Sequence, residues 1–149
     1  MNKSPDPAIH LGLLEDYIGL HLRMAQEAVL RAFIASSSQP DFKTGRFATL
    51  MIIRLNPGLS QIEICRAIGR DKSTISPLIT ALEKEGLILR ESSAKDRRSV
   101  TLHLTQAGED ALDVLMPHVE RHETRLDVIV GDAKPDLIAL LKKLIEALS

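Results

Sequence analysis

The chain has 149 residues, the length of one domain able to bury a substantial core, and its hydrophobic content of 44% is ordinary for a globular protein. Its apolar runs are short and interrupted by charges, and its N-terminus lacks a signal-peptide stretch, so we expect a cytoplasmic protein without a membrane span. A single cysteine, Cys65, excludes an internal disulfide and a cysteine-built zinc site, and we expect it to be a buried, inert thiol.

The formal net charge of −1 is distributed unevenly along the chain. Residues 60–104 carry eight Lys and Arg against six Asp and Glu, whereas residues 105–149 carry five against nine. Contact with a polyanion depends on local potential rather than on total charge. The basic middle segment is therefore the part expected to meet one.

A long helical pattern is predicted from residue 11 to residue 35, with apolar positions on two sides. One side carries Leu11, Leu14, Ile18, Ala25, Val29 and Ala32, and the other carries Leu13, Leu20, Met24 and Ala28. Because one covering layer would leave the second side exposed, a second subunit is the simplest cover. A shorter helix over about residues 44–55 follows and ends at the turn 56–58.

Two helices joined by a tight turn are predicted next. Ser60 and Glu63 have the spacing of a capping box that begins a helix, and Gly69 is the residue type that ends one. A second helix begins at about Asp71, and its apolar residues follow the spacing of a one-sided helix: Ile75, Leu78, Ile79 and Leu82. The exposed faces then hold small polar residues, which allow a helix to approach base edges and phosphates.

Two short alternating strands then flank a basic loop. We expect Leu87 and Leu89 on one face of the first strand, and Val100, Leu102 and Leu104 on one face of the second. An isolated basic loop is most often a solvated hairpin tip. After a helix-turn-helix, however, this loop is better interpreted as a wing that contacts DNA.

The C-terminal part is predicted to be helical over residues 105–130, with a kink at Pro117, and over residues 133–148. The last helix has too many apolar residues for one narrow stripe, which again indicates a partner: Leu137, Ile138, Leu140, Leu141, Leu144, Ile145 and Leu148. We therefore expect one domain over residues 1–149, with a winged helix-turn-helix lobe at 44–104 and dimerisation helices at 11–35 and 105–148.

Four motifs occur in order at defined spacings: DKSTIS at residues 71–76, LEKEGLI at 82–88, DRR at 96–98 and LHLTQAG at 102–108. Together they resemble the MarR family of transcriptional regulators. The resemblance implies a mainly α fold with a small β-wing, and an obligate homodimer with one winged helix-turn-helix per subunit. It also implies a repressor, usually of a neighbouring operon, that a small molecule or an oxidant releases.

The predicted partner is double-stranded operator DNA, and the predicted contacts come from the helix-turn-helix and the wing. They are Ser60, Gln61, Lys72, Ser73, Thr74, Ser76, Pro77, Thr80, Lys95, Asp96, Arg97 and Arg98. By resemblance, Arg98 enters the minor groove and Asp96 braces it. Pro77 has two interpretations, a tolerated helix kink or an apolar contact with a thymine methyl group.

In this family, small-molecule effectors bind between the dimer helices and the DNA-binding lobes. The first helix offers five polar candidates for ligand contact, although such residues are routine on solvated faces: Tyr17, His21, Arg23, Gln26 and Arg31. The run LRMAQEAV at residues 22–29 is similar to a branch that regulates aromatic-acid catabolism, some members of which sense aromatic acyl-CoA thioesters. An aromatic acid or its CoA thioester is therefore the expected effector.

Two alternatives to a ligand-released repressor stay open. In the first alternative, the winged helix is a protein-interaction module that does not bind DNA. In the second, the protein is a metal-responsive regulator that uses His118 and His122. The sequence shows no nucleophile elbow, catalytic carboxylate pair or cofactor loop, so we expect neither an enzyme nor a cofactor, and no catalytic or metal site is assigned.

Overall fold

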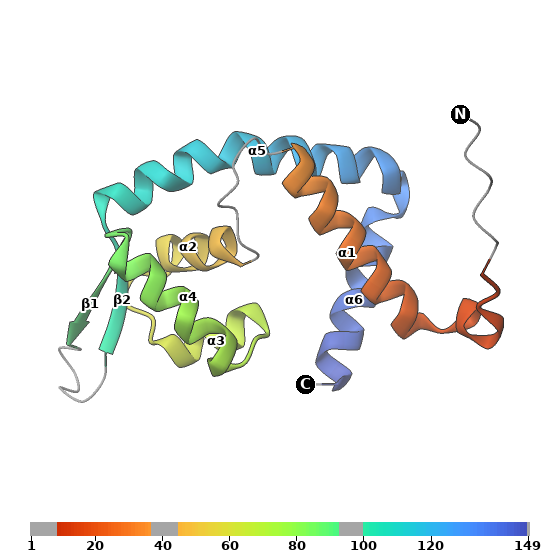
Figure 1. Cartoon of the computed structure of the whole chain (residues 1–149), viewed down its shortest axis with the longest axis horizontal. Coiled ribbons are helices and arrows are strands. Elements are labelled where there is room, and N and C mark those ends of the chain that lie inside the picture. The colour runs from red at the N-terminus through yellow and green to blue at the C-terminus, as the bar shows by residue number, and fades with distance from the viewer. Residues whose placement is uncertain (1–8, 37–44, 93–99, 149) are drawn as a thin grey trace. The chain divides into compact units, whose positions relative to one another are not determined.

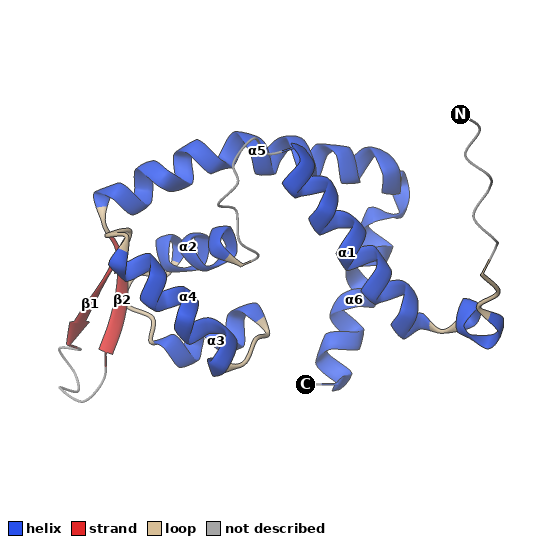
Figure 2. Ribbon diagram, in the orientation of Figure 1, coloured by secondary structure: helices blue, strands red, loops and turns tan. Residues whose placement is uncertain are grey.

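The computed structural model describes residues 9–36, 45–92 and 100–148, which fall into two compact units, Met1–Ser38 and Gln39–Ser149. Helices dominate both units, and the described residues form one two-stranded sheet (Figures 1 and 2). This confirms the predicted fold class, mainly α with a small β-wing. No helix in the described ranges is long and apolar enough to span a membrane.

The first unit contains two helical elements where the sequence predicted one. A 3-10 helix, η1 (Gly12–Asp16), is followed by α1 (Ile18–Ser36). Tyr17 separates them with an extended ψ of 115°, and its carbonyl accepts the N–H groups of Leu20 and His21 that begin α1. The prediction of a continuous helix from residue 11 was wrong, because apolar spacing persists across a change of helix type.

The second unit begins with three helices, α2 (Arg46–Leu55), α3 (Gln61–Ile68) and α4 (Lys72–Lys84). The Ser60–Glu63 capping box forms with both of its reciprocal hydrogen bonds. Gly69 ends α3 with φ +69°, a conformation that costs a glycine little. Both signals were therefore interpreted correctly, and only the start of α2, at Arg46 rather than at residue 44, differs.

A single hydrophobic core joins these helices to the sheet and to the next helix, α5 (Gln106–Val130). It consists of Leu50 and Ile53 of α2, Ile64 of α3, Ile75, Ile79 and Leu82 of α4, then Leu87, Ile88, Leu102 and Leu112. Because α4 contributes three fully buried residues, its inner face is fixed and its outer face is left exposed.

The sheet pairs β1 (Ile88–Ser92) with β2 (Val100–Leu104) in antiparallel order. Ile88 lies opposite Leu104, so the inward residue of β1 is Ile88, and the prediction that Leu89 shares a face with Leu87 in this strand was wrong. Leu87 lies instead in the turn that follows α4, where its N–H donates to the Leu82 carbonyl and so caps the end of that helix. On its other edge β2 forms a bridge with Leu59.

The C-terminal elements follow the predicted boundaries closely. Thr105 caps α5, which stays helical through Pro117 and ends at Val130. A short 3-10 turn, η2 (Gly131–Ala133), leads into α6 (Lys134–Leu148). The described residues of α6 include no buried side chain, although Leu137, Ile138 and Leu140 are all apolar. This helix therefore presents apolar surface that the rest of the second unit leaves uncovered.

Candidate DNA interface

The exposed face of α4 is the centre of the candidate interface. Ser73, Pro77, Thr80 and Lys84 are exposed and recur at intervals of four, three and four residues, which places them on one side of the helix. Bulky side chains are absent from this face between Ser73 and Thr80. A helix with such a face can approach the floor of a major groove closely.

The first turn of α4 is organised around Asp71. One carboxylate oxygen, Oδ1, accepts the Thr74 amide at 2.7 Å and the Ser73 hydroxyl at 2.6 Å. The hydrogen bond from Ser73, followed by that from the Thr74 amide, holds the pKa of Asp71 below its usual range. Asp71 is therefore ionised at neutral pH and satisfies a helix N–H that water or a phosphate would otherwise bind.

Three of the predicted contact residues also have structural roles within the helix-turn-helix. The Ser60 hydroxyl accepts the Glu63 amide and donates to the Glu63 carboxylate, and the backbone bond from Ser60 is the main cause of the lowered pKa of Glu63. The Gln61 amide donates to the Ser76 hydroxyl and so links α3 to α4. Lys72, Thr74 and Thr80 are exposed on α4, as a contact with DNA requires.

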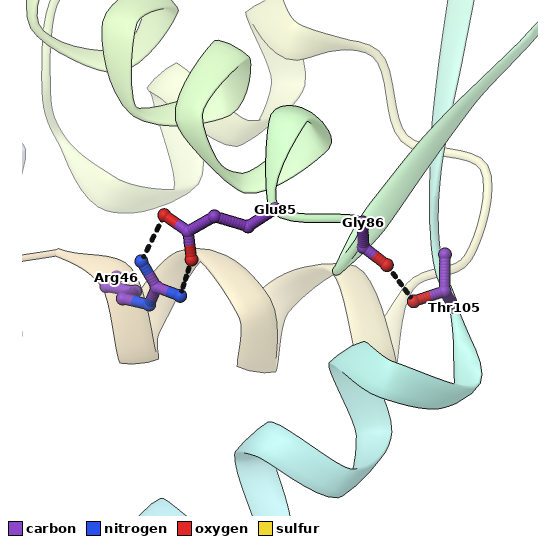
Figure 3. A network of polar contacts seen from close by, with 4 residues as sticks. All are labelled: Arg46, Glu85, Gly86 and Thr105. Atoms are coloured by element: carbon purple, nitrogen blue, oxygen red, sulfur yellow. Dashed lines mark hydrogen bonds and ion pairs between the residues drawn. The ribbon is translucent and has the colours of Figure 1, made fainter.

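The C-terminal end of α4 is fixed by contacts that are distant in sequence (Figure 3). Arg46 of α2 forms a two-pronged ion pair with Glu85, with Nη1 and Oε1 3.0 Å apart. The Gly86 carbonyl accepts the Thr105 hydroxyl at 2.6 Å, which ties α4 to the start of α5. The sequence did not predict these contacts, because residues as far apart as Arg46 and Glu85, which are separated by 39 positions, show no local spacing pattern.

The base of the wing carries its own polar contacts. Arg90 of β1 donates from Nε to Glu83 of α4 at 2.8 Å, and the Thr101 hydroxyl donates to the Glu91 carbonyl at 3.3 Å. The predicted wing contacts lie outside the described residues: Lys95, Asp96, Arg97 and Arg98. For these four, contact with DNA stays a prediction from the sequence.

The five candidate ligand residues are all exposed, and all lie in the first unit. Tyr17 precedes α1, while His21, Arg23, Gln26 and Arg31 lie on it. The His21 ring nitrogen Nε2 is 2.6 Å from the Glu15 carbonyl, so this side chain bridges η1 and α1. Their role in ligand binding stays a prediction.

The two candidate metal ligands of α5 have different surroundings. His118 is half-buried and its Nδ1 accepts a hydrogen bond from Arg121 at 2.9 Å, whereas His122 is 6% exposed. Within the described ranges, no three His, Cys, Asp or Glu side chains gather as a metal site requires. Cys65 is half-buried against the core rather than fully buried.

The arrangement of α3, α4 and the hairpin defines a winged helix-turn-helix protein, and the comparisons with known proteins agree. A sequence profile of the MarR family matches residues 43–100. A putative transcriptional regulatory protein for the hcr operon of Thauera aromatica is 36% identical, with 89% of this chain and 81% of that protein covered. The chain belongs to the MarR family of transcriptional regulators, and it is therefore a regulator and not an enzyme.

Solved structures extend the likeness over nearly the whole chain. The transcriptional repressor CouR bound to a 23-mer DNA duplex is 31% identical with a TM-score of 0.83, covering 93% of this chain and 99% of that one. CouR bound to p-coumaroyl-CoA is 28% identical with a TM-score of 0.81, covering 93% and 98%. Both share the fold of this chain.

Proposed function

We propose that this protein is a cytoplasmic, homodimeric repressor that binds operator DNA through α4 and the wing and is released by an aromatic acid or its CoA thioester. The observation that carries the DNA-binding part is the outer face of α4, where small polar side chains surround a capped helix start. Lys72 lies beside these residues and can neutralise a phosphate of DNA, whereas a module that contacts only proteins has no need of a cation there. The likeness to DNA-bound CouR supports the same conclusion.

The dimer is proposed from the apolar surface of α6. Ile145 is 65% exposed and Leu148 83% exposed in the single chain, although both are large apolar residues. A helix with apolar residues and no buried side chain requires another surface to cover it. A second copy supplies that cover and at the same time provides the second α4 that a palindromic site requires.

Replacing the wing arginine, Arg98→Ala, is expected to weaken specific DNA binding by about 1–3 kcal/mol and to relax the preference for A·T pairs at the flanks. The physical reason is that a narrow A·T minor groove concentrates negative potential, which attracts a weakly hydrated guanidinium group. Gel-shift titration on the DNA upstream of the protein's own gene measures both effects.

Arg90→Ala is the matched control for this measurement. Arg90 is already paired with Glu83 at the base of the wing, so its loss is expected to change affinity by no more than about 0.5 kcal/mol. If Arg98→Ala behaves like Arg90→Ala, the assignment of the wing is wrong. If the wild-type protein shifts no duplex, the proposed function itself fails.

The effector is expected to release DNA because it favours a dimer shape whose two α4 helices do not match successive major grooves. The coupling is reciprocal, so DNA weakens effector binding by the same factor, and about 1–3 kcal/mol is typical. The p-coumaroyl-CoA complex of CouR supports an aromatic thioester as the candidate. Titration calorimetry with a panel of aromatic acids and their CoA thioesters, with and without the duplex, measures the coupling.

Arg23→Ala and Arg31→Ala are expected to weaken effector binding while DNA affinity stays nearly unchanged, since both arginines are exposed on α1 and suited to a carboxylate or a phosphate. An effector response that survives the loss of all five polar candidates would remove this site from the account. Binding by no member of the panel would remove the aromatic effector and leave the DNA-binding proposal intact.

A further inference from the structure

We propose that Ser73 acts toward DNA only as a hydrogen-bond acceptor, and that it reads an exocyclic amino group in the major groove, either N6 of adenine or N4 of cytosine. This inference rests on the proposed function, because it requires α4 to lie in the major groove. It deepens that function by assigning a chemical preference to one side chain of the recognition helix.

The polarity of Ser73 follows from its contact with Asp71. A serine hydroxyl has one proton to donate and two lone pairs to accept with. The Ser73 proton is directed to Asp71 Oδ1, 2.6 Å away. Because an ionised carboxylate can only accept, the direction of this bond is fixed, and only lone pairs of the Ser73 oxygen point elsewhere.

The same carboxylate oxygen also accepts the Thr74 amide at 2.7 Å, so Asp71 cannot turn away without losing the cap of α4. The helix start therefore holds the acceptor of the Ser73 hydroxyl, Asp71 Oδ1, in place. Ser73 itself is exposed, on the same side of α4 as Pro77 and Thr80. Its accepting oxygen is consequently available to a ligand that approaches this face.

The available partners of such an oxygen are few. Phosphate oxygens, N7 of either purine, O6 of guanine and O4 of thymine are all acceptors, and they cannot bond to a second acceptor. In the major groove, hydrogen bonds are donated only by the amino groups of adenine and cytosine. Ser73 therefore distinguishes which strand carries the adenine or cytosine of a base pair, and it does not bind the phosphate backbone of the DNA.

Ser76 provides the opposite case on the same helix. Its oxygen accepts a hydrogen bond from the Gln61 amide, and among the described residues no group accepts its own hydroxyl proton. Ser76 can therefore donate to a phosphate or to a base acceptor, whereas Ser73 cannot. The two serines lie on the same helix and have the same side chain, but they differ in the hydrogen-bond role that they can offer to DNA. Ser76 is therefore the matched control.

The test begins with the wild-type protein selecting its preferred duplex from a randomised library. Amino groups are then deleted one position at a time, with purine in place of adenine and 2-pyrimidinone in place of cytosine. We expect one position per half-site where the deletion weakens wild-type binding about threefold to tenfold but leaves binding by Ser73→Ala unchanged. Ser73→Thr and Ser76→Ala both keep a hydroxyl at position 73. Whatever their overall affinity for the duplex, each is expected to lose affinity at that position by the same factor as the wild-type protein.

Two results overturn the inference. In the first, no position shows a response to amino deletion that depends on Ser73, which would place this side chain against the backbone or away from the DNA. In the second, the dependent response appears when 7-deazapurines remove N7, which would make Ser73 a donor. If the wild-type protein enriches no duplex, the proposed function fails, and that outcome is distinct from both results.

Discussion

Gly108→Ala is expected to reduce the free energy of unfolding by about 3 kcal/mol, which is a large share of the stability of a domain of this size. A Cβ at this position would lie 2.1 Å from the Leu87 carbonyl oxygen and 3.1 Å from Leu104 Cδ2. The first neighbour is backbone, so it cannot rotate away as a side chain would. Urea unfolding followed by circular dichroism measures the loss.

The same substitution is expected to impair DNA binding in the fraction that stays folded. The Leu87 oxygen accepts the Thr105 amide at 3.1 Å, and this bond joins the end of α4 to the start of α5. If the added Cβ displaces α5, this bond is strained and the end of α4, the helix proposed to contact DNA, moves with it. Gly19→Ala in α1 is the control, because its Cβ would meet nothing within 4 Å, and it is expected to be neutral or to stabilise. Equal effects of the two substitutions would contradict the close approach at Gly108.

Leu141→Asp is expected to weaken the dimer about 100-fold to 10,000-fold. Burying one leucine contributes about 1.5–3 kcal/mol, and twofold symmetry counts the substitution twice. Leu141 lies on α6 and is half-buried in the single chain, so full burial of a leucine is an upper limit for its contribution, and it adjoins the exposed apolar residue Leu140. DNA binding should fall with the dimer, because a monomer presents only one α4. Sedimentation velocity over a concentration series measures the dimer constant, and gel shifts measure the accompanying loss of DNA binding.

Lys142→Asp is the matched control for this experiment, since it introduces the same residue at the adjacent, exposed position of α6. The control is expected to keep both the dimer and DNA binding. A stable dimer of Leu141→Asp, or a folded wild-type monomer at micromolar concentration, would contradict the proposed interface.

Local signals explain why so much of the helix-turn-helix could be predicted. The caps formed by Ser60, Asp71 and Thr105 each join a side chain to a backbone amide three residues later, so their whole chemistry lies within one short window of sequence. The buried stripe of α4 is likewise periodic, and its three fully buried residues all came from the predicted set. These features need no knowledge of the rest of the chain.

The features that the sequence did not reveal depend on tertiary contacts. The sequence analysis recognised LHLTQAG as a motif. Only the structure shows why its last position requires glycine: the Leu87 carbonyl occupies the space that a side chain of residue 108 would need. The face of β1 was misassigned because Leu87 is buried in the turn that caps α4 and not in the strand, so the alternation of β1 begins one residue later, at Ile88. The role of Ser73 as an acceptor toward DNA also could not be predicted from the sequence. A serine hydroxyl can both donate and accept, and only the hydrogen bond to Asp71 in the structure decides between these roles.

The most direct test of the central claim is the stoichiometry of the protein on DNA. Sedimentation velocity of the wild-type protein with a fluorescently labelled copy of its selected duplex reports the mass of the complex. We expect two chains per duplex, on half-sites about 10 base pairs apart, and no population with one chain. A complex with a single chain, or a labelled duplex that sediments unchanged at micromolar protein, would contradict the account of a dimeric DNA-binding regulator.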